Sequence, residues 1–368
     1  MTEVWRYIDC GPEGPFDVNA RSPLLGMRVA ETGQPAMTTS VGGVTHLNVG
    51  WFDDVDANVD LAKCAELGVQ VIRRPVFGGG TAFYDKDAAV MWGWLLPKAT
   101  HPDLDAELTH FQPIFMDALH RLGITGVRYE GSSDLRIEGR KLGAVTAQDA
   151  VSCNSVGGFI NTRQPDIDLY LAVARVPEGK FKDKLIQDRR QYVVTAEELR
   201  GRPLGYEEFR DALVAACEDA GMKLDHVPLT DEEREGLPGV REKIGSDRYL
   251  RRVSSERFRA EAPPGTRVGF GAHKGRKLCQ AGVALDGGGT VAAAMMAGDM
   301  HVGPPDTMKR VAAALVGTPA ADTAALRSRI AGVFDGPDVH QPDALMGVTT
   351  DDLLTAVEKA VAAAETAT

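Results

Sequence analysis

The sequence predicts an α+β protein with two domains, and three observations carry this prediction. The chain has 368 residues, which corresponds to two domains at about 150 residues per domain. Its first part alternates amphipathic helices with short apolar strands, two of which read as a hairpin. A polar, charged stretch from Pro228 to Glu261 then leads into a second, strand-rich part. We therefore predict domains at residues 1–258 and 263–368.

The first helices and strands are marked by glycines and prolines at their ends. A helix is predicted from Asn58 to Leu67, because apolar residues recur there at helical spacing and Gly68 follows as a C′ residue. Val69–Ile72 then reads as a strand. A second helix is predicted over Pro113–Leu122, with proline near its first position, and Ile124–Tyr129 reads as the strand after it.

A hairpin and a further helix complete the first part. Leu135–Ile137 and Leu142–Thr146 read as two strands that turn at Glu138–Arg140. Tyr206–Ala220 has the apolar stripe of an amphipathic helix and is followed by Gly221.

The second part begins after the polar connection. Within that connection the acidic run Asp231–Glu235 is typical of a solvated helix start. Strands are predicted at Lys277–Leu285 and Thr290–Ala297. Helices are predicted at Pro305–Val316 and at Thr350–Ala364, the latter behind a capping pattern.

The composition excludes several classes of protein. The formal net charge is −11, which opposes binding to nucleic acid or to an anionic membrane. No signal peptide is evident, and no apolar stretch is long enough to span a bilayer. Scattered cysteines without a C-x-x-C pair argue against a disulfide framework or a zinc site and favour the reducing cytoplasm. They are Cys10, Cys64, Cys153, Cys217 and Cys279.

The segment from Val71 to Asp85 carries the first chemical motif. A strand runs into Arg73 and Arg74, and three glycines, Gly78–Gly80, follow shortly after. Because glycines have no side chains, the backbone of this loop can lie against a bulky ligand or a phosphate. Adjacent arginines supply fixed positive charge for an anion. On the glycines alone, a hairpin with a solvated arginine pair stays open as the alternative.

A second motif lies in the predicted hairpin, over residues 133–148. Lys141 begins a short apolar strand that is followed by small residues. An ammonium held there is a point charge that can bind a carboxylate oxygen and a phosphate oxygen together. The alternative is an exposed hairpin lysine.

The two motifs together resemble one family. The pattern R-R-x-x-x-G-G-G-[TA]-x-[FY]-x-D, followed by S/N-D-[LI]-x-[IV]-x-G-[RK]-K-[LI]-x-G, is similar to that of the lipoate–protein ligases. These belong to the biotin/lipoyl ligase and octanoyltransferase superfamily. Trp5–Asp9 resembles the family's opening strand, and Gly265–Gly317 resembles the accessory C-terminal domain of its full-length form.

The resemblance implies a fold and an activity. The large domain would be a mixed, mainly antiparallel sheet flanked by helices, and the small C-terminal domain would be α+β. The activity would be that of an ATP-dependent lipoate–protein ligase. With ATP and Mg²⁺ it would convert lipoate, or a related acid, into an acyl-adenylate. It would then pass the acyl group to a lysine of a lipoyl domain or of a glycine-cleavage H-type carrier protein.

The resemblance also implies roles for residues. Lys141 would contact the carboxyl and phosphate oxygens as the catalytic residue, and Asp134 would help hold Mg²⁺ or the nucleotide. Strand residues around Val49, Val71 and Leu142 would form an apolar tunnel for the acyl chain. The remaining predicted substrate- and nucleotide-binding residues are Arg73, Arg74, Gly78, Gly79, Gly80, Thr81, Asp85 and Gly143.

Departures from the family pattern leave the acid and the acceptor open. Tyr84 stands where the family usually has His, Val156 where it has the His of His-Gly, and Asp53 where Gln is common. One alternative function is octanoyl or lipoyl transfer from a carrier thioester through a cysteine, for which Cys153 is the cysteine nearest to Lys141 in sequence. Another is a non-catalytic lipoate-binding module. For the ligase we hypothesise that the C-terminal domain swings between the two half-reactions.

Overall fold

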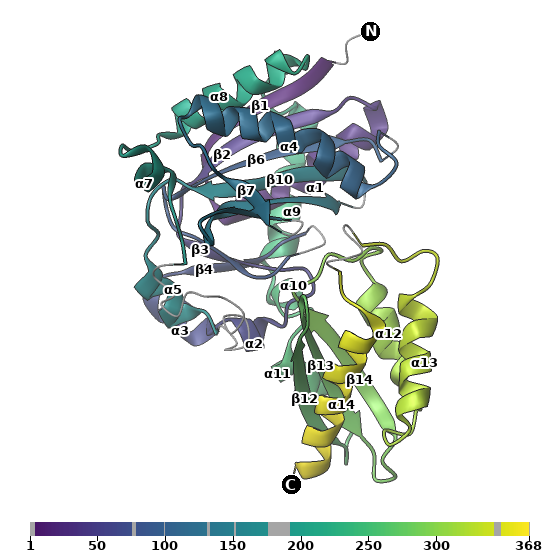
Figure 1. Cartoon of the computed structure of the whole chain (residues 1–368). Helices are drawn as coiled ribbons and strands as arrows, with labels where there is room; N and C mark the ends of the chain where they lie inside the picture. Colours follow the sequence, from purple (N-terminus) through teal and green to yellow (C-terminus); the bar gives the residue numbers. More distant parts are fainter. Residues whose placement is uncertain are drawn as a thin grey trace.

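The computed structural model describes residues 4–75, 79–98, 100–130, 133–150, 152–175, 192–341 and 347–367. The larger, N-terminal part contains an eight-stranded sheet and a three-stranded sheet, and the C-terminal part contains another three-stranded sheet with its helices (Figure 1). The predicted α+β class is confirmed.

The large sheet is mixed and mainly antiparallel, as predicted. Its strand order is β11-β1-β2-β6-β10-β9-β8-β7, and only the pairs that include β1 are parallel. Strand bounds are β1 (Val4–Glu13), β2 (Ala36–Gly42), β6 (Ala89–Leu96), β7 (Arg128–Glu130), β8 (Asp134–Ile137), β9 (Arg140–Asp149), β10 (Asn154–Asn161) and β11 (Lys223–His226).

Helices cover both faces of this sheet (Figure 1). One face packs against α4 (Leu104–Arg121) and α8 (Tyr206–Asp219), with Trp92 stacked on Phe115 at 3.9 Å between ring centroids. The other face packs against α1 (Pro15–Thr32), which in turn contacts α9 (Asp231–Gly245). The short α7 (Ala196–Arg200) lies beside the first of these cores.

The smaller N-terminal sheet presents the Gly-rich loop. Its strands are β3 (His46–Val49), β4 (Gln70–Arg73) and β5 (Ala82–Tyr84), in the order β4-β3-β5. The loop connects the two outer strands. Three short helices form a separate core with this sheet: α2 (Val55–Asn58), α3 (Leu61–Leu67) and α5 (Ile167–Val173).

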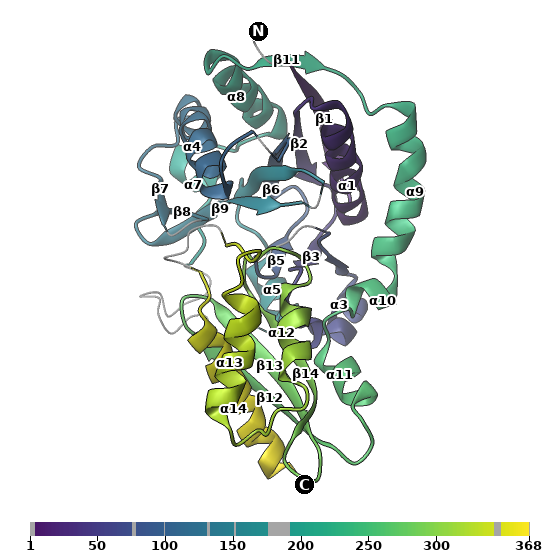
Figure 2. The same cartoon turned by 90° about the vertical axis from the view of Figure 1, so that its right-hand side faces the viewer.

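The C-terminal part has a sheet with helices on one face (Figure 2). Its core gathers side chains from Cys279 to Ala364 and includes Phe52 from the N-terminal part. Gly269 lets α14 lie close to the sheet, because a Cβ there would be 2.2 Å from the Ala360 carbonyl oxygen. Its elements are β12 (Arg267–Lys274), β13 (Leu278–Leu285), β14 (Val291–Gly298), α12 (Thr307–Leu315), α13 (Thr323–Phe334) and α14 (Thr350–Thr366). Two short helices, α10 (Asp247–Leu250) and α11 (Ser255–Glu261), precede them in the polar connection.

Two predicted helices have different bounds. The helix expected from Asn58 is divided, since the Asp60 side chain accepts from the Lys63 amide and begins α3 at Leu61. Helix α4 begins before its predicted start, because Asp103 caps it, and Pro113 lies inside it. A proline at the first helical position and one in the interior look alike in sequence, which explains the error.

The polar connection is also more ordered than expected. It contains α9, α10 and α11, and α9 begins at a Thr230–Glu233 capping box within the predicted acidic helix start. Its few apolar residues, including Ile244, pack with Ala20 of α1 and Ile72 of β4. The connection is thus anchored to the N-terminal part.

The β8–β9 turn offers a stability test. Glu138 and Gly139 have φ values of 50° and 77°, so both central residues occupy the region that a two-residue type I′ turn requires and that most L-residues avoid. Replacing Glu138 with Asn is expected to raise the free energy of unfolding by about 0.5–1 kcal/mol. Urea denaturation checks this, and an unchanged or lower midpoint would contradict it.

Candidate functional site

The β8–β9 hairpin holds Lys141 against Asp134. The Lys141 ammonium donates to Asp134 Oδ1 at 2.7 Å, and Arg136 donates to Oδ2 of the same carboxylate at 2.6 Å. The Lys141 and Asp134 side chains keep 25% and 23% of their surface exposed. The tight turn places these side chains on neighbouring strands, so the ammonium is fixed in position yet accessible.

Electrostatics keep this pair ionised. Burial alone would raise the pKa of Asp134, but the Lys141 and Arg136 cations outweigh it and hold that pKa well below its usual range. Burial alone would lower the pKa of Lys141, and the Asp134 carboxylate instead raises it. Lys141 is therefore a permanent cation at neutral pH.

Asp134 does not form a magnesium site by itself. Both of its oxygens accept hydrogen bonds from cations. No group of three or more His, Cys, Asp or Glu side chains suited to a metal ion occurs in the described ranges. Mg²⁺ prefers several oxygen ligands without competing cations, so no reaction step is assigned to the ion.

Arg73 forms a structural clamp instead of facing a ligand. Its side chain is fully buried. It donates to the carbonyls of Gly50 and Asp53 at 2.5 and 2.9 Å, and to those of Leu250 and Val253 at 2.9 and 3.0 Å. This geometry corrects the prediction that Arg73 charges the pocket: burial lowers its pKa to about 10, and its donors are directed at the backbone.

Arg74 points to the Gly loop. Its guanidinium donates to the Gly80 carbonyl at 2.8 Å. Gly79 has φ 66°, and a Cβ on it would be 3.1 Å from Arg74 Nη2. Gly50 makes room for the same loop, because a Cβ on it would be 2.1 Å from the Gly79 carbonyl oxygen. Gly78, also predicted for the site, lies outside the described residues.

The two other predicted loop residues brace the loop. Thr81 donates its hydroxyl to Asp53 at 2.7 Å. Asp85 accepts from the Thr45 hydroxyl at 2.7 Å and from the Asp166 amide at 3.2 Å. Asp53, one of the departures from the family pattern, thus supports the loop from the segment after β3.

Tyr84 connects the sheet of the Gly loop to the large sheet. Its ring centroid lies 5.0 Å from that of Phe159 in β10, which pairs with β9, the strand of Lys141. Burial raises the pKa of Tyr84, while the Arg74 and Lys141 cations both lower it. Gly143 contributes differently: a Cβ there would be 2.0 Å from the Phe159 carbonyl oxygen, so its glycine permits close pairing of β9 with β10.

The residues expected around the acyl tunnel belong to the cores of two sheets. Val49 belongs to the core of the small sheet, whereas Leu142 belongs to the core beneath α4 and α8. Both are fully buried. Val71 packs at the edge of the small-sheet core. Val49 and Leu142 therefore belong to separate cores.

Cys153 is remote from Lys141. It follows β9, whose first residues hold Lys141, so the length of that strand separates them. Its side chain is fully buried beside Gly26, and burial raises the pKa of its thiol to about 12. Burial likewise raises the pKa of the four other thiols to about 11 or 12. Each is therefore a poor nucleophile at neutral pH.

Sequence reasoning missed His301, which reaches the Gly loop from the C-terminal part. Its Nε2 lies 3.5 Å from the point where a Gly79 Cβ would stand. Trp51, two residues before Asp53, donates its indole N–H to the Pro305 carbonyl in the C-terminal part at 3.0 Å. Contacts between distant segments leave no spacing pattern, so no sequence pattern pointed to either residue.

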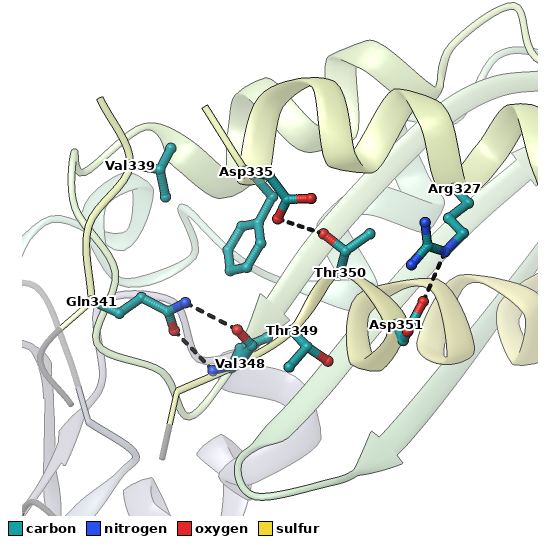
Figure 3. A pocket seen from close by; sticks show the side chains of 9 residues that line it. Arg327, Asp335, Val339, Gln341, Val348, Thr349, Thr350 and Asp351 are labelled. Atoms are coloured by element: carbon teal, nitrogen blue, oxygen red, sulfur yellow. Dashed lines mark hydrogen bonds and ion pairs between the residues drawn. The ribbon is translucent and has the colours of Figure 1, made fainter. Parts of the chain in front are cut away.

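A separate pocket of about 380 Å³ lies where α13 ends and α14 begins (Figure 3). Asp335 accepts from the Thr350 hydroxyl at 2.9 Å, and Arg327 donates to Asp351 at 2.9 Å. The pocket contains none of the predicted site residues. Elsewhere, no helix among the described segments has the length and apolar character needed to cross a bilayer.

Comparisons with known proteins point to one family. Residues 45–218 match the lipoyl protein ligase A/B catalytic domain. The octanoyltransferase LipM of Geobacillus kaustophilus is 24% identical over 282 residues, which cover 67% of this chain and 98% of that protein. Further curated relatives at 22% and 26% identity carry the same name.

Two solved structures have a similar fold. LipL1 of P. falciparum in complex with lipoate has a TM-score of 0.65 at 9% identity, covering 88% of this chain and 94% of that one. The bipartite lipoate protein ligase of Thermoplasma acidophilum, described with its E2 lipoyl domain, has a TM-score of 0.56 at 18% identity, covering 69% and 98%. The family match over residues 45–218 and the curated relatives support the lipoate ligase and octanoyltransferase family for this chain, and the solved structures show the same fold.

Proposed function

We propose that this enzyme attaches a lipoyl or octanoyl group to a lysine of a lipoyl-type carrier domain. The observation that carries the proposal is the Lys141 ammonium, which is fixed 2.7 Å from the Asp134 carboxylate on the β8–β9 hairpin. The E2 lipoyl domain described with the archaeal ligase supports this class of acceptor. A glycine-cleavage H-type carrier is a second acceptor of the same kind. We further propose that residues 1–258 form the catalytic domain of this enzyme and residues 263–368 its accessory domain.

Lys141 is suited to stabilise charge during acyl transfer. When the acceptor amine attacks the acyl carbon, a C–N bond forms and negative charge develops on the acyl oxygen. A preorganised ammonium beside that oxygen lowers the barrier without reorganising during the reaction. The bond to the leaving group then breaks, and the amine loses a proton to solvent.

The first candidate donor is a carrier-bound octanoyl thioester. The shared name of the curated relatives, octanoyltransferase, favours it. In that reaction the C–S bond breaks and the carrier thiol leaves. The structure describes all five cysteines of this chain, and burial raises the pKa of each thiol. We therefore propose that the acceptor lysine would attack such a thioester directly.

The second candidate donor is a free acid activated by ATP. The absence of a reactive thiol among the five cysteines favours it, because all five have raised pKa values. A route through an adenylate needs no enzyme nucleophile. The acid's carboxylate attacks the α-phosphate and pyrophosphate leaves; the acceptor amine then attacks the acyl carbon and AMP leaves. Lys141 would contact both the carboxyl and the α-phosphate oxygens.

A direct experiment separates the donors. A lipoyl domain is incubated with the enzyme and either octanoyl-carrier thioester or octanoate or lipoate with ATP, and acylation of its lysine is followed by mass spectrometry. Acylation with the thioester alone supports the transferase, and acylation with release of AMP supports the ligase. Failure with both donors would refute the proposed function.

Removal of the candidate nucleophilic thiol tests the role of cysteine. Cys153→Ala is expected to leave the acylation rate within about twofold of the wild type, because this thiol is remote and protonated. Cys64→Ala, another buried thiol, is the matched control. A loss of about a thousandfold or more confined to Cys153→Ala would instead indicate a cysteinyl intermediate.

A further inference from the structure

Asn48 is a buried polar residue in the small N-terminal sheet. It lies in β3 and is 6% exposed. Its side-chain Oδ1 is buried and accepts no hydrogen bond from any residue that the structure describes. A buried amide oxygen without a donor destabilises the folded chain, and such atoms are rare in proteins. A bound molecule that donates a hydrogen bond to Oδ1 would remove this cost.

Asn48 lies at the base of the Gly loop. In the sheet it is paired with Ile72 of β4 on one side and with Ala82 of β5 on the other, and the loop connects these two strands. Arg74, which follows β4, donates to the Asn48 backbone carbonyl at 3.4 Å. The side chain of Asn48 is therefore held directly beside the Gly loop.

The side chain of Asn48 points toward the large sheet. Leu47 and Val49, its neighbours in β3, belong to the core that the small sheet forms with α2, α3 and α5. Because successive residues of a strand face opposite sides, Asn48 points away from that core. Ala82, directly opposite Asn48, packs against a cluster that includes Met91 of the large sheet. The amide without a partner thus faces the same apolar cluster.

This apolar cluster joins the small sheet to the strands beside Lys141. It consists of Tyr84, Ala89 and Met91, with Val18, Ala82 and Phe159 packed against it. Phe159 lies on β10 opposite Ala144 of β9, the strand that begins with Arg140 and Lys141. Ala82 and Phe159 are only half-buried. Accessible apolar surface therefore lies beside the strand that carries the candidate catalytic ammonium.

A plain alkyl chain on this surface cannot satisfy Asn48. An octanoyl chain has no hydrogen-bond donor, so it would cover the amide oxygen and leave it without a partner. A chain that carries a thiol or a hydroxyl group can donate an S–H or O–H hydrogen to Oδ1. A site with a buried polar group therefore discriminates against a chain that lacks the complementary group.

We propose that Asn48 is a specificity-determining residue, which selects an acyl chain with a thiol or hydroxyl donor over the plain octanoyl chain. This inference rests on the proposed function and narrows its acyl group. The acyl carbonyl lies at Lys141, and the chain runs along the apolar cluster to Asn48. The reduced, dithiol form of a lipoyl chain and a hydroxylated octanoyl chain have the required donor. The closed dithiolane ring of oxidised lipoate and the octanoyl chain lack it.

The test measures selectivity among octanoate, oxidised lipoate, dihydrolipoate and ω-hydroxyoctanoate. Calorimetry gives the affinity of the full chain for each free acid. Transfer to a lipoyl domain, from the acid with ATP or from its carrier thioester, gives kcat/KM. In the wild type we expect at least one of the two donor-bearing chains to be preferred about tenfold over octanoate and oxidised lipoate. Preference for dihydrolipoate assigns a thiol, and preference for ω-hydroxyoctanoate assigns a hydroxyl; either result supports the inference.

Asn48→Leu is compared with Asn58→Leu as the matched control. Leucine has the same branched shape as asparagine but no polar atoms. Asn58 is a second buried asparagine, whose side-chain nitrogen has no partner among the described residues, and it lies in α2 on the other face of the sheet. In Asn48→Leu the preference for the donor-bearing chain is expected to fall about tenfold, whereas Asn58→Leu should keep it. A merely structural role would change the rates with all four acids alike.

A preference that persists in Asn48→Leu, or a wild type that prefers octanoate, would overturn the inference. Asn48→Val, with a smaller side chain, takes the place of Asn48→Leu if leucine prevents folding. A wild type that transfers no acyl group from any donor would refute the proposed function. The affinities for the free acids need no transfer and would still decide the role of Asn48.

Discussion

Replacing Lys141 with alanine is expected to lower acyl transfer by about a thousandfold or more with either donor. The ammonium is the cation held at 2.7 Å by Asp134 on the site hairpin, and alanine cannot stabilise the acyl oxygen. Arg136 still pairs with Asp134 at 2.6 Å in this variant, so the carboxylate is not left as an isolated charge and the fold should persist. Carrier acylation and circular dichroism measure the two effects.

Arg140→Ala is the matched control for this prediction. Arg140 precedes Lys141 on the same strand but binds outward, donating to Glu198 and to the Val193 carbonyl. Its loss is expected to change acyl transfer less than about fivefold, because exposed ion pairs contribute little. If Lys141→Ala kept most of the wild-type rate, the proposed role of the ammonium would be wrong.

Replacing Arg73 with methionine is expected to lower the free energy of unfolding by at least about 3 kcal/mol. Methionine preserves much of the side-chain volume but donates no hydrogen bonds. The carbonyls of Asp53 and Leu250 then lose a donor at 2.9 Å, and each orphaned acceptor costs about 1–3 kcal/mol. The carbonyls of Gly50 and Val253 also lose the Arg73 donor but keep a backbone amide donor at 3.2 Å. Urea denaturation at neutral pH measures the loss.

Arg163→Met is the control for this loss of stability. Arg163 is an exposed arginine whose guanidinium lies 3.7 Å from Asp85, and its replacement is expected to change stability by less than about 0.5 kcal/mol. A destabilisation of Arg73→Met no larger than that of the control would show that the clamp is dispensable.

The β8–β9 hairpin and Lys141 could be predicted from the sequence because the residues that specify them are neighbours along the chain. Glu138 and Gly139 mark the turn, and alternation along β8 and β9 brings Lys141 beside Asp134. The same alternation explains what happened to the arginine pair. Successive residues of a strand face opposite sides, so Arg73 turns to the buried backbone while Arg74 turns to the loop.

The parts of the site that were missed depend on contacts between distant segments. His301 approaches Gly79 from the other end of the chain, and no short-range pattern encodes that approach. The placement of the predicted tunnel residues depends on distant contacts as well. Val49 and Leu142 are apolar strand residues, as predicted, but sequence does not tell which of two cores an apolar strand residue faces.

The segment Gly50–Asp53 couples the two parts of the enzyme mechanically. Phe52 fills the C-terminal core, and its carbonyl accepts from the Gly298 amide at 3.0 Å. The next residue, Asp53, holds Thr81 of the Gly loop at 2.7 Å. A swing of the C-terminal part must therefore either carry this segment along, and shift the loop with it, or expose a buried phenyl ring at a cost of about 1.5–3 kcal/mol. The peptide bond between Phe52 and Asp53 therefore links movement of the C-terminal part to the Gly loop of the N-terminal part.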